Sequence, residues 1–219
     1  MKRVSLPLEK CMTTAHARGR RSERGFTLIE LVASILIIGA LGTIAVPVYV
    51  DLRASARVAV NKSAGATFAA ALQQAKANFL VKGSGGAQLD VPGFGDGTLD
   101  YSDLGFPVGK TLASTGATSP TYASELQCKE VLEALIKGVT ANTPADGYPA
   151  PGKSFYAYTG GAMISYCYFY LLDSSGQFSS ANGNYIYFMY DIGTPAMLGA
   201  RGRVLVFNPY SGQNEYFEP

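Results

Sequence analysis

The chain has 219 residues and a formal net charge of +2, a length that accommodates one long helix and one head domain. The positive charge is concentrated at the start. Residues 1–25 carry seven lysines and arginines against two glutamates, a net +5, so the remaining chain is −3. Because the basicity belongs to a short N-terminal segment, the net charge does not indicate nucleic-acid binding, and no nucleic-acid partner is expected.

An almost purely apolar run extends from Leu28 to Val50 and contains one charged residue, Glu30. The run is about as long as the ~20 residues that a membrane-spanning helix needs. Its basic flank predicts that the N-terminus stays in the cytoplasm and that the chain after Val50 is exported. A carboxylate within such a helix costs about 2.5–3.5 kcal/mol on insertion scales, which indicates a functional role for Glu30. The alternative is a side chain shallow enough to reach the membrane interface.

The helical pattern continues past the apolar run, through a segment rich in good helix formers. Apolar residues recur there at helical spacing and form one stripe: Ala64, Phe68, Leu72, Ala75 and Phe79. The sequence therefore predicts one helix from about Phe26 to Val81, ended by the glycine-rich residues 82–86. Its first half is apolar all round, and its second half is expected to bury one face.

The rest of the chain predicts a short helix followed by strands. Ser124 and Gln127 have the spacing of a capping box, which predicts a helix from there to about Lys137, stopped by Gly138. Strand patterns cover Ser154–Thr159, Met163–Leu172, Tyr185–Tyr190 and Arg203–Phe207. Residues 83–120 are predicted to be rich in loops, and residues 142–151 to form a connection. We expect an α+β architecture in which an antiparallel sheet packs on the exported half of the long helix.

Two of the three cysteines, Cys128 and Cys167, lie after the apolar run, whereas Cys11 precedes it. An even pair on the exported side favours a disulfide. Such a bridge would close about 39 residues and stabilise the fold by about 4 kcal/mol in the loop-entropy model. Cys167 falls on the apolar face of its predicted strand, the side that a helix would cover. The alternative is a two-thiolate metal site, but His16 is the only histidine and no histidine follows it.

The junction before the apolar run reads Arg24-Gly25-Phe26-Thr-Leu-Ile-Glu30. It resembles the prepilin cleavage motif of type IV pilins and type II secretion pseudopilins. The resemblance implies cleavage after Gly25 by a prepilin peptidase, a mature chain that begins at Phe26, and N-methylation of Phe26. A general secretory signal would be cut after its apolar segment instead. An unprocessed signal anchor is the alternative.

The same resemblance implies a pilin fold that polymerises through its N-terminal helix. The free amine of Phe26 would pair with Glu30 of a neighbouring subunit, since each charge alone is costly in a low dielectric. Gly39, Gly42 and Pro47 interrupt the apolar half of the helix. Pilins have a proline at the place of Pro47, and small residues allow helices to approach closely. We therefore expect these three residues to serve helix packing; a kinked anchor is the alternative.

These expectations divide the chain into three segments: a cleaved basic leader (1–25), a long helix with a transmembrane N-terminal half (26–82), and an exported globular head (83–219). The expected location is the bacterial inner membrane before assembly, with the N-terminus in the cytoplasm, and an extracellular pilus afterwards. The expected partners are other pilin subunits, the prepilin peptidase, the inner-membrane assembly machinery and membrane lipid. No cofactor is expected.

The leading hypothesis is a structural subunit of a type IV pilus that serves surface adhesion or attachment. Within the superfamily, residues 47–57 resemble the mannose-sensitive haemagglutinin pilins. One alternative is a type II secretion pseudopilin. Another is a membrane-anchored exported binding protein that does not polymerise.

Enzymatic readings find little support in the sequence. Without a histidine after residue 25, the exported chain can form neither a Ser-His-Asp nor a Cys-His arrangement. Residues 147–154 match the P-loop pattern, but Pro149 and Pro151 lack the N–H groups that a phosphate cradle needs, and a strand is predicted to follow. We therefore expect no enzyme activity.

Two further patterns carry weaker hypotheses. Four carboxylates in a glycine-rich loop offer the oxygen ligands that calcium prefers, but their spacing matches no EF-hand loop: Asp90, Asp96, Asp100 and Asp103. No metal site is predicted from them. The tyrosines of the strand segments invite a carbohydrate-binding interpretation, but tyrosine also suits half-buried strand faces, which is the interpretation preferred here.

Overall fold

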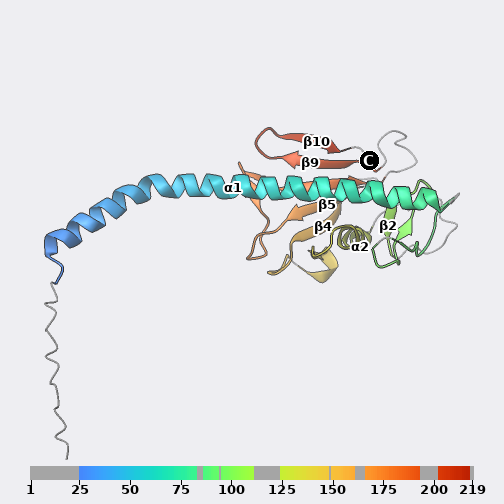
Figure 1. Cartoon of the computed structure of the whole chain (residues 1–219), viewed down its shortest axis with the longest axis horizontal. Coiled ribbons are helices and arrows are strands. Elements are labelled where there is room, and N and C mark those ends of the chain that lie inside the picture. The colour runs from blue at the N-terminus through green and yellow to red at the C-terminus, as the bar shows by residue number, and fades with distance from the viewer. Residues whose placement is uncertain are drawn as a thin grey trace, which may run out of the picture. The chain divides into compact units, whose positions relative to one another are not determined.

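The computed structural model describes residues 25–82, 86–93, 95–110, 124–147, 149–160, 166–192 and 202–217 (Figure 1). The chain forms two compact units, residues 1–46 and 47–219. Helix α1 spans Leu28–Val81, so the border between the units falls within this helix, at Pro47. The predicted long helix is confirmed. It begins at Leu28 rather than Phe26 because Thr27 occupies the capping position before the first helical residue.

A six-stranded sheet forms the centre of the second unit, in the order β10-β9-β8-β5-β4-β3. Its strands are β3 (Ala141–Asn142), β4 (Phe155–Gly160), β5 (Tyr166–Leu171), β8 (Tyr187–Asp191), β9 (Val204–Asn208) and β10 (Gln213–Phe217). All neighbouring strands are antiparallel except β3 and β4, which run parallel. The predicted antiparallel sheet is therefore confirmed, with one short parallel strand added at an edge.

Two smaller hairpins complete the described strands. β1 (Asp100–Tyr101) pairs with β2 (Pro107–Gly109), and β6 (Ser180–Ala181) pairs with β7 (Asn184–Tyr185). A 3-10 helix, η1, spans Pro144–Asp146. Residues 83–120 were predicted to be rich in loops and residues 142–151 to form a connection. The short strands and the 3-10 helix within them were not predicted individually, because runs of two or three residues are too short to show a period.

The four predicted strands correspond to β4, β5, β8 and β9. The predicted strand Tyr185–Tyr190 is divided at Ile186, whose N–H and carbonyl bond to Ser179 and Leu171 instead of continuing one ladder. The first three residues of the predicted strand Met163–Leu172 lie outside the described residues. β10 was not predicted, because its sequence is polar and it lies at the edge of the sheet.

Helix α2 spans Glu125–Leu135 and begins as predicted. The Ser124 hydroxyl accepts the N–H of Gln127 at 3.2 Å, and the Gln127 side chain accepts the N–H of Ser124 at 2.9 Å. This reciprocal pair satisfies two of the N–H groups that a helix start leaves open. The helix ends two residues before the predicted Lys137, and Gly138 takes a positive φ of 83° just beyond it.

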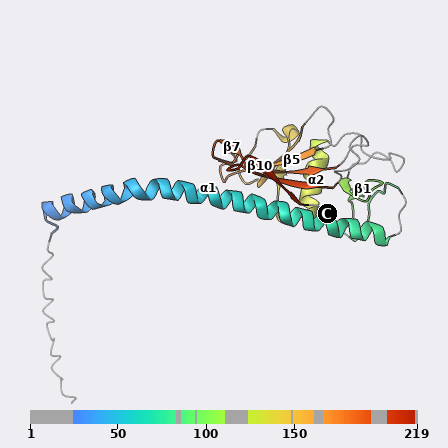
Figure 2. The ribbon, with the colours of Figure 1, turned by 90° about the horizontal axis from the view of Figure 1, so that it is seen from above.

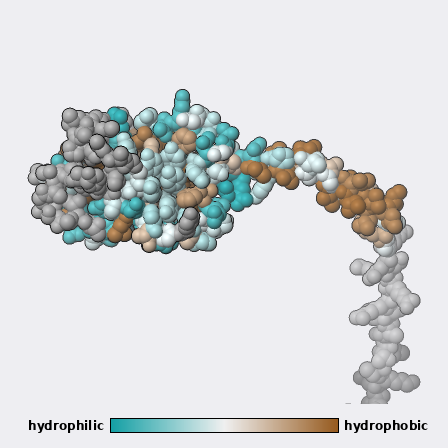
Figure 3. Space-filling model, turned by 180° about the vertical axis from the view of Figure 1, so that it is seen from behind, coloured by the Kyte–Doolittle hydropathy of each residue, from teal (hydrophilic) through white to brown (hydrophobic). Residues whose placement is uncertain are grey.

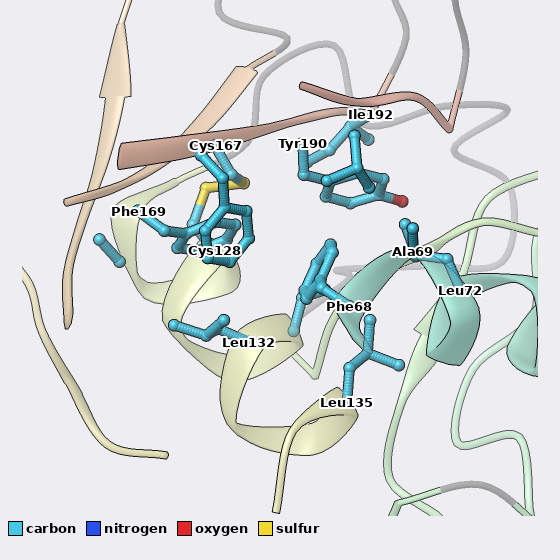
Figure 4. Close-up of a cluster of buried hydrophobic side chains, with 14 of the residues drawn as sticks. Phe68, Ala69, Leu72, Cys128, Leu132, Leu135, Cys167, Phe169, Tyr190 and Ile192 are labelled. Atoms are coloured by element: carbon cyan, nitrogen blue, oxygen red, sulfur yellow. A yellow bond between two sulfur atoms is a disulfide. The ribbon is translucent and has the colours of Figure 1, made fainter. Parts of the chain in front are cut away.

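Both helices pack on one face of the sheet. Figures 1 and 2 show the C-terminal half of α1 running alongside the sheet, and the core includes side chains from α1, α2 and the sheet strands. Phe68 of α1 is fully buried at the centre, with its ring centroid 5.4–5.5 Å from those of Phe169, Phe188 and Tyr190 (Figure 4). The predicted apolar stripe faces this core: Phe68, Leu72, Ala75 and Phe79 are buried and Ala64 is partly buried.

Helix α1 approaches the sheet closely at Gly65. A Cβ atom there would lie 2.3 Å from Cγ2 of Val206 and 3.6 Å from Cβ of Phe188, so only glycine fits without a shift. One turn earlier, the fully buried Asn61 donates its side-chain N–H to the carbonyl of Tyr187 at 2.9 Å. This contact gives the end of β8 a hydrogen-bond partner from the helix and fixes the register between them.

Candidate processing and assembly site

The described part of the first unit is the N-terminal part of α1, and its apolar side chains are exposed. Within the described chain, α1 is the one helix that is long and apolar enough to cross a membrane, and none of its most apolar window is buried. Figure 3 shows this apolar surface in brown along the N-terminal part of the helix. A contiguous exposed apolar surface of this size indicates a lipid or protein partner.

Thr27 and Glu30 begin this helix as a capping box. The N–H and the hydroxyl of Thr27 donate to Oε2 of Glu30 at 2.9 and 2.8 Å, and the Thr27 hydroxyl accepts the N–H of Glu30 at 3.3 Å. The Thr27 carbonyl accepts the N–H of Leu31, which closes the first turn. Glu30 therefore has a structural task within its own chain, in addition to the intermolecular one predicted.

The sequence analysis missed Thr27. The signal was present, because Thr27-Leu-Ile-Glu30 has the T-x-x-E form of a capping box directly before an apolar run. Glu30 is the third residue of the helix, the position from which a glutamate side chain reaches back to the capping residue. Thr27 is thus the additional residue that the structure places at this site.

Gly25 and Phe26 lie in the non-helical segment just before α1. The Phe26 side chain is 78% exposed, and a Cβ atom at Gly25 would meet nothing within 4 Å. A peptide bond in an exposed segment outside a helix can be bound by a peptidase without unfolding its surroundings. The predicted cleavage bond has this placement.

Gly39, Gly42 and Pro47 all lie inside α1. A Cβ atom on Gly39 or Gly42 would meet nothing within 4 Å, so no contact with another described residue requires either glycine. The hydroxyl groups of Ser34 and Thr43 donate to helix carbonyls one turn earlier, at Glu30 and Ala40. These bonds satisfy polar groups internally, which a segment in lipid requires.

In the head, a disulfide joins Cys128 on α2 to Cys167 on β5, with Cα atoms 5.5 Å apart and a sequence separation of 39. Both cysteines are fully buried in the core (Figure 4). Tyr166, Tyr168 and Tyr170 alternate with the buried face of β5 and are half-buried on the other face. The predicted disulfide and the predicted facing of this strand are confirmed.

Two of the four carboxylates considered for calcium, Asp96 and Asp100, make other contacts. Asp96 accepts hydrogen bonds from the Lys110 ammonium and from Thr98, and the Lys110 bond is the main reason that the pKa of Asp96 lies well below its usual range. Asp100 accepts the N–H of Asp90 at 2.9 Å. In the part of the chain that the structure describes, no three His, Cys, Asp or Glu side chains are grouped so that they could hold a metal ion.

The P-loop-like segment leads into a strand, as predicted. The N–H of Ser154 donates to the Thr140 carbonyl at 2.9 Å, and β4 begins at the next residue. A phosphate-binding loop would instead open a helix, whose N-terminal N–H groups hold the phosphate. Tyr148 lies outside the described residues.

Comparison with known families finds one match in this region. Residues 20–46 match the family model of the prokaryotic N-terminal methylation motif. Neither the curated proteins nor the solved structures gave a match. The motif covers the end of the basic flank, the Gly25–Phe26 junction, the Thr27–Glu30 cap and most of the apolar run. The chain therefore carries the N-terminal methylation motif of a type IV pilin-like prepilin, joined to a pilin-like α+β head.

Proposed function

We propose that this protein is a structural subunit of a type IV pilus, cut after Gly25 by the prepilin peptidase and polymerised through α1. The observation that carries the proposal is the methylation motif at residues 20–46, which includes the start of a helix whose apolar side chains are exposed. Type IV pilin-like proteins are structural, and we assign this chain a structural role without catalysis.

Before assembly, the apolar part of α1 anchors the subunit in the inner membrane, with the basic leader in the cytoplasm and the head exported. The subunit then exchanges lipid for the helices of its neighbours. Lateral burial of apolar surface, worth about 25 cal/mol per Å², holds the helices together once they leave the membrane. The partners are the prepilin peptidase, the inner-membrane assembly machinery and other subunits, in a filament that carries the heads outside.

Phe26 becomes the N-terminal residue after cleavage and is the proposed site of N-methylation. Its amine pairs with Glu30 of a neighbouring subunit. An unpaired carboxylate or ammonium costs several kcal/mol in a low dielectric, so the pair forms in one axial register only. Thr27 supports this contact because its two hydrogen bonds hold the Glu30 carboxylate at the start of the helix.

Gly39, Gly42 and Pro47 serve the packing of α1 against its neighbours. At both glycines an added Cβ atom would meet no other residue of the described chain, which leaves room for a close approach by another helix. Pro47 lacks an N–H, so the helix has one hydrogen bond fewer at this point, which lowers the cost of local unwinding during assembly.

Intact mass and N-terminal sequence of the protein from membranes and from sheared surface fractions test this proposal. We expect a chain that starts at Phe26, carries one added methyl group, and lacks two hydrogens because of the disulfide. Recovery in sheared filaments supports a pilus subunit over a secretion pseudopilin or a non-polymerising anchor. A chain that still begins at Met1, or one that stays in the membrane when filaments are sheared off, would overturn the proposal.

Glu30→Ala tests the assembly contact separately, and Asp51→Ala is its control, because Asp51 is the next acid on the same helix and lies just beyond the apolar run. We expect Glu30→Ala to be inserted in the membrane but scarce in sheared filaments, whereas Asp51→Ala assembles normally. Equal filament yields from the two variants would refute the role of Glu30.

A further inference from the structure

Three aromatic rings from different segments of the head line one small cavity. Tyr170 lies on β5, Tyr185 ends β7, and Phe178 lies in the segment between these strands, where it bridges to Leu172. The cavity has a volume of about 90 Å³. Among the residues that the structure describes, these three are its lining, so its walls are aromatic and carry no charge.

The rings surround the cavity instead of forming one stack. Their centroids lie 5.5–6.2 Å apart. The Tyr170 ring is inclined by 72° to that of Phe178 and by 88° to that of Tyr185, and the latter two are inclined by 59° to each other. With centroids this close together, one group at the mouth of the cavity can lie within about 6 Å of all three rings.

The cavity is open to solvent and electrically suited to a cation. Tyr185 is 57% exposed, and Tyr170 and Phe178 are half-buried. Burial raises the pKa of the Tyr170 phenol, so its hydroxyl stays neutral at physiological pH. The face of a neutral aromatic ring is the negative end of its quadrupole. The net charge of −3 on residues 26–219 adds a long-range attraction for cations.

We propose that Tyr170, Phe178 and Tyr185 form a binding site for a quaternary ammonium group. The faces of aromatic rings attract such a cation. Because a quaternary ammonium group has no N–H, it needs no hydrogen-bond acceptor in the cavity. A lysine ammonium would lose hydration there without finding a carboxylate among the lining side chains. The ligand class is therefore choline-like, either free or displayed on a surface.

The competing interpretation is a hydrophobic cluster that only supports the β6–β7 hairpin. That interpretation predicts that the cavity binds a charged ligand no more tightly than a neutral ligand of the same shape. Choline and 3,3-dimethylbutanol separate the two, because they share a shape but only choline is charged. We would titrate both into the full mature chain in maltoside micelles and follow tyrosine fluorescence, which is free of tryptophan emission because the chain contains no tryptophan.

We expect saturable choline binding that is about fivefold tighter than that of the neutral isostere, since one cation–π contact at an exposed site is worth up to about 1 kcal/mol. Equal affinity for the two compounds, or no saturable signal from choline, would overturn the proposal. Because the readout uses neither filaments nor processing, failure here is distinct from failure of the pilus assignment.

Tyr185→Leu removes one ring from the cavity, and Tyr158→Leu is the matched control, because Tyr158 is an exposed strand tyrosine outside the lining. We expect Tyr185→Leu to weaken choline binding about fivefold to thirtyfold, which corresponds to about 1–2 kcal/mol, and the control to leave it unchanged. Phe178→Leu should weaken choline binding independently, because it removes a second ring from the cavity. Equal binding by all three variants would refute the assignment.

Beads coated with phosphocholine or phosphoethanolamine identify the source of the group. Retention on phosphocholine beads, competed by free choline, supports a ligand displayed on a surface. Binding of free choline without bead retention supports a soluble ligand of the same class. Equal retention on both coatings would contradict recognition of a quaternary ammonium group.

Discussion

Thr27 and Glu30 are joined at the start of α1 by two hydrogen bonds to one oxygen: the N–H and the hydroxyl of Thr27 both donate to Oε2 of Glu30, at 2.9 and 2.8 Å. Cleavage after Gly25 would make Thr27 the second residue of the mature chain. The Glu30 carboxylate is proposed to attract the Phe26 amine of a neighbouring subunit. Within its own chain it is held by Thr27, the residue that follows Phe26. Capping within the subunit and pairing between subunits would then depend on the same side chain.

Thr27→Val tests this dependence, because it removes the hydroxyl and nearly keeps the shape. We expect the chain to be processed but to yield fewer filaments, since loss of a capping hydroxyl costs about 1 kcal/mol and removes one of the two hydrogen bonds that hold the Glu30 carboxylate. The measurement is the amount of mature protein in sheared and membrane fractions. Thr43→Val is the control, because its hydroxyl donates to Ala40 in the same helix. Filament yields that match between the two variants would show that the cap plays no part in assembly.

The Cys128–Cys167 disulfide ties α2 to the central strand β5. Replacing both cysteines with alanine should lower the free energy of unfolding of the head by about 2–4 kcal/mol, the usual range for a bridge of this kind. Thermal unfolding followed by circular dichroism, with and without reductant, measures the effect. Cys11→Ala is the control, since this cysteine lies in the proposed leader. If reductant shifted the midpoint of the double variant as much as that of the wild type, the stabilisation would not come from this bridge.

Much of the fold could be predicted because it depends on strong local periods. The stripe that includes Phe68 and Phe79 predicted which face of α1 is buried, and the alternation through Cys167 predicted which face of β5 meets the helices. β10 could not be predicted, because its pairing with β9 is made by the backbone of a polar edge segment. The two-residue strand β3 depends on its parallel neighbour β4 and has no period of its own.

The functional residues also differ in how far they can be predicted from the sequence. The Gly25–Phe26 junction and Glu30 form a local motif and can be read directly from the sequence, and so could Thr27 have been. The aromatic cavity could not be predicted, because Tyr170 and Tyr185 are brought together by strand pairing and a hairpin. The sequence shows that the strand segments are rich in tyrosine, but only the fold determines which of these rings share a cavity.

Gly65→Ala should destabilise the head although alanine is the better helix former. The new Cβ atom would lie 2.3 Å from Cγ2 of Val206, a clash inside the core. Overpacking of this kind costs about 1–3 kcal/mol, against a gain of about 1 kcal/mol in helix propensity. In a Val206→Ala background the clash is gone, so the same change should be neutral or stabilising. The midpoints of thermal unfolding of the four proteins in this cycle give the answer, and an equal loss in both backgrounds would rule out the contact with Val206 as its cause.

Acid should weaken the ion pair between Lys129 of α2 and Asp146 of the 3-10 helix η1. Lys129 donates to Oδ2 of Asp146 at 2.8 Å, and the Thr143 N–H donates to the same oxygen at 3.0 Å. These bonds, the Lys129 bond first, hold the pKa of Asp146 below its ordinary value of 3.8. A carboxylate with a lowered pKa stabilises the fold above the ordinary value, and this contribution is lost as the pH falls through the lower, folded-state pKa.

Asp146→Asn should therefore be less stable than the wild type at pH 7, by about 1 kcal/mol or less because the pair is partly exposed. The difference should shrink as the pH falls from the ordinary carboxyl value towards the lower folded-state pKa, below which Asp146 is protonated in the folded wild type as well. Lys129→Met should produce a similar loss at pH 7, and the double variant should lose less than the sum of the two, since both changes break one contact. Unfolding midpoints across pH measure this. A gap between wild type and Asp146→Asn that stays constant down to pH values where Asp146 is fully protonated would mean that the charge of this residue does not stabilise the head.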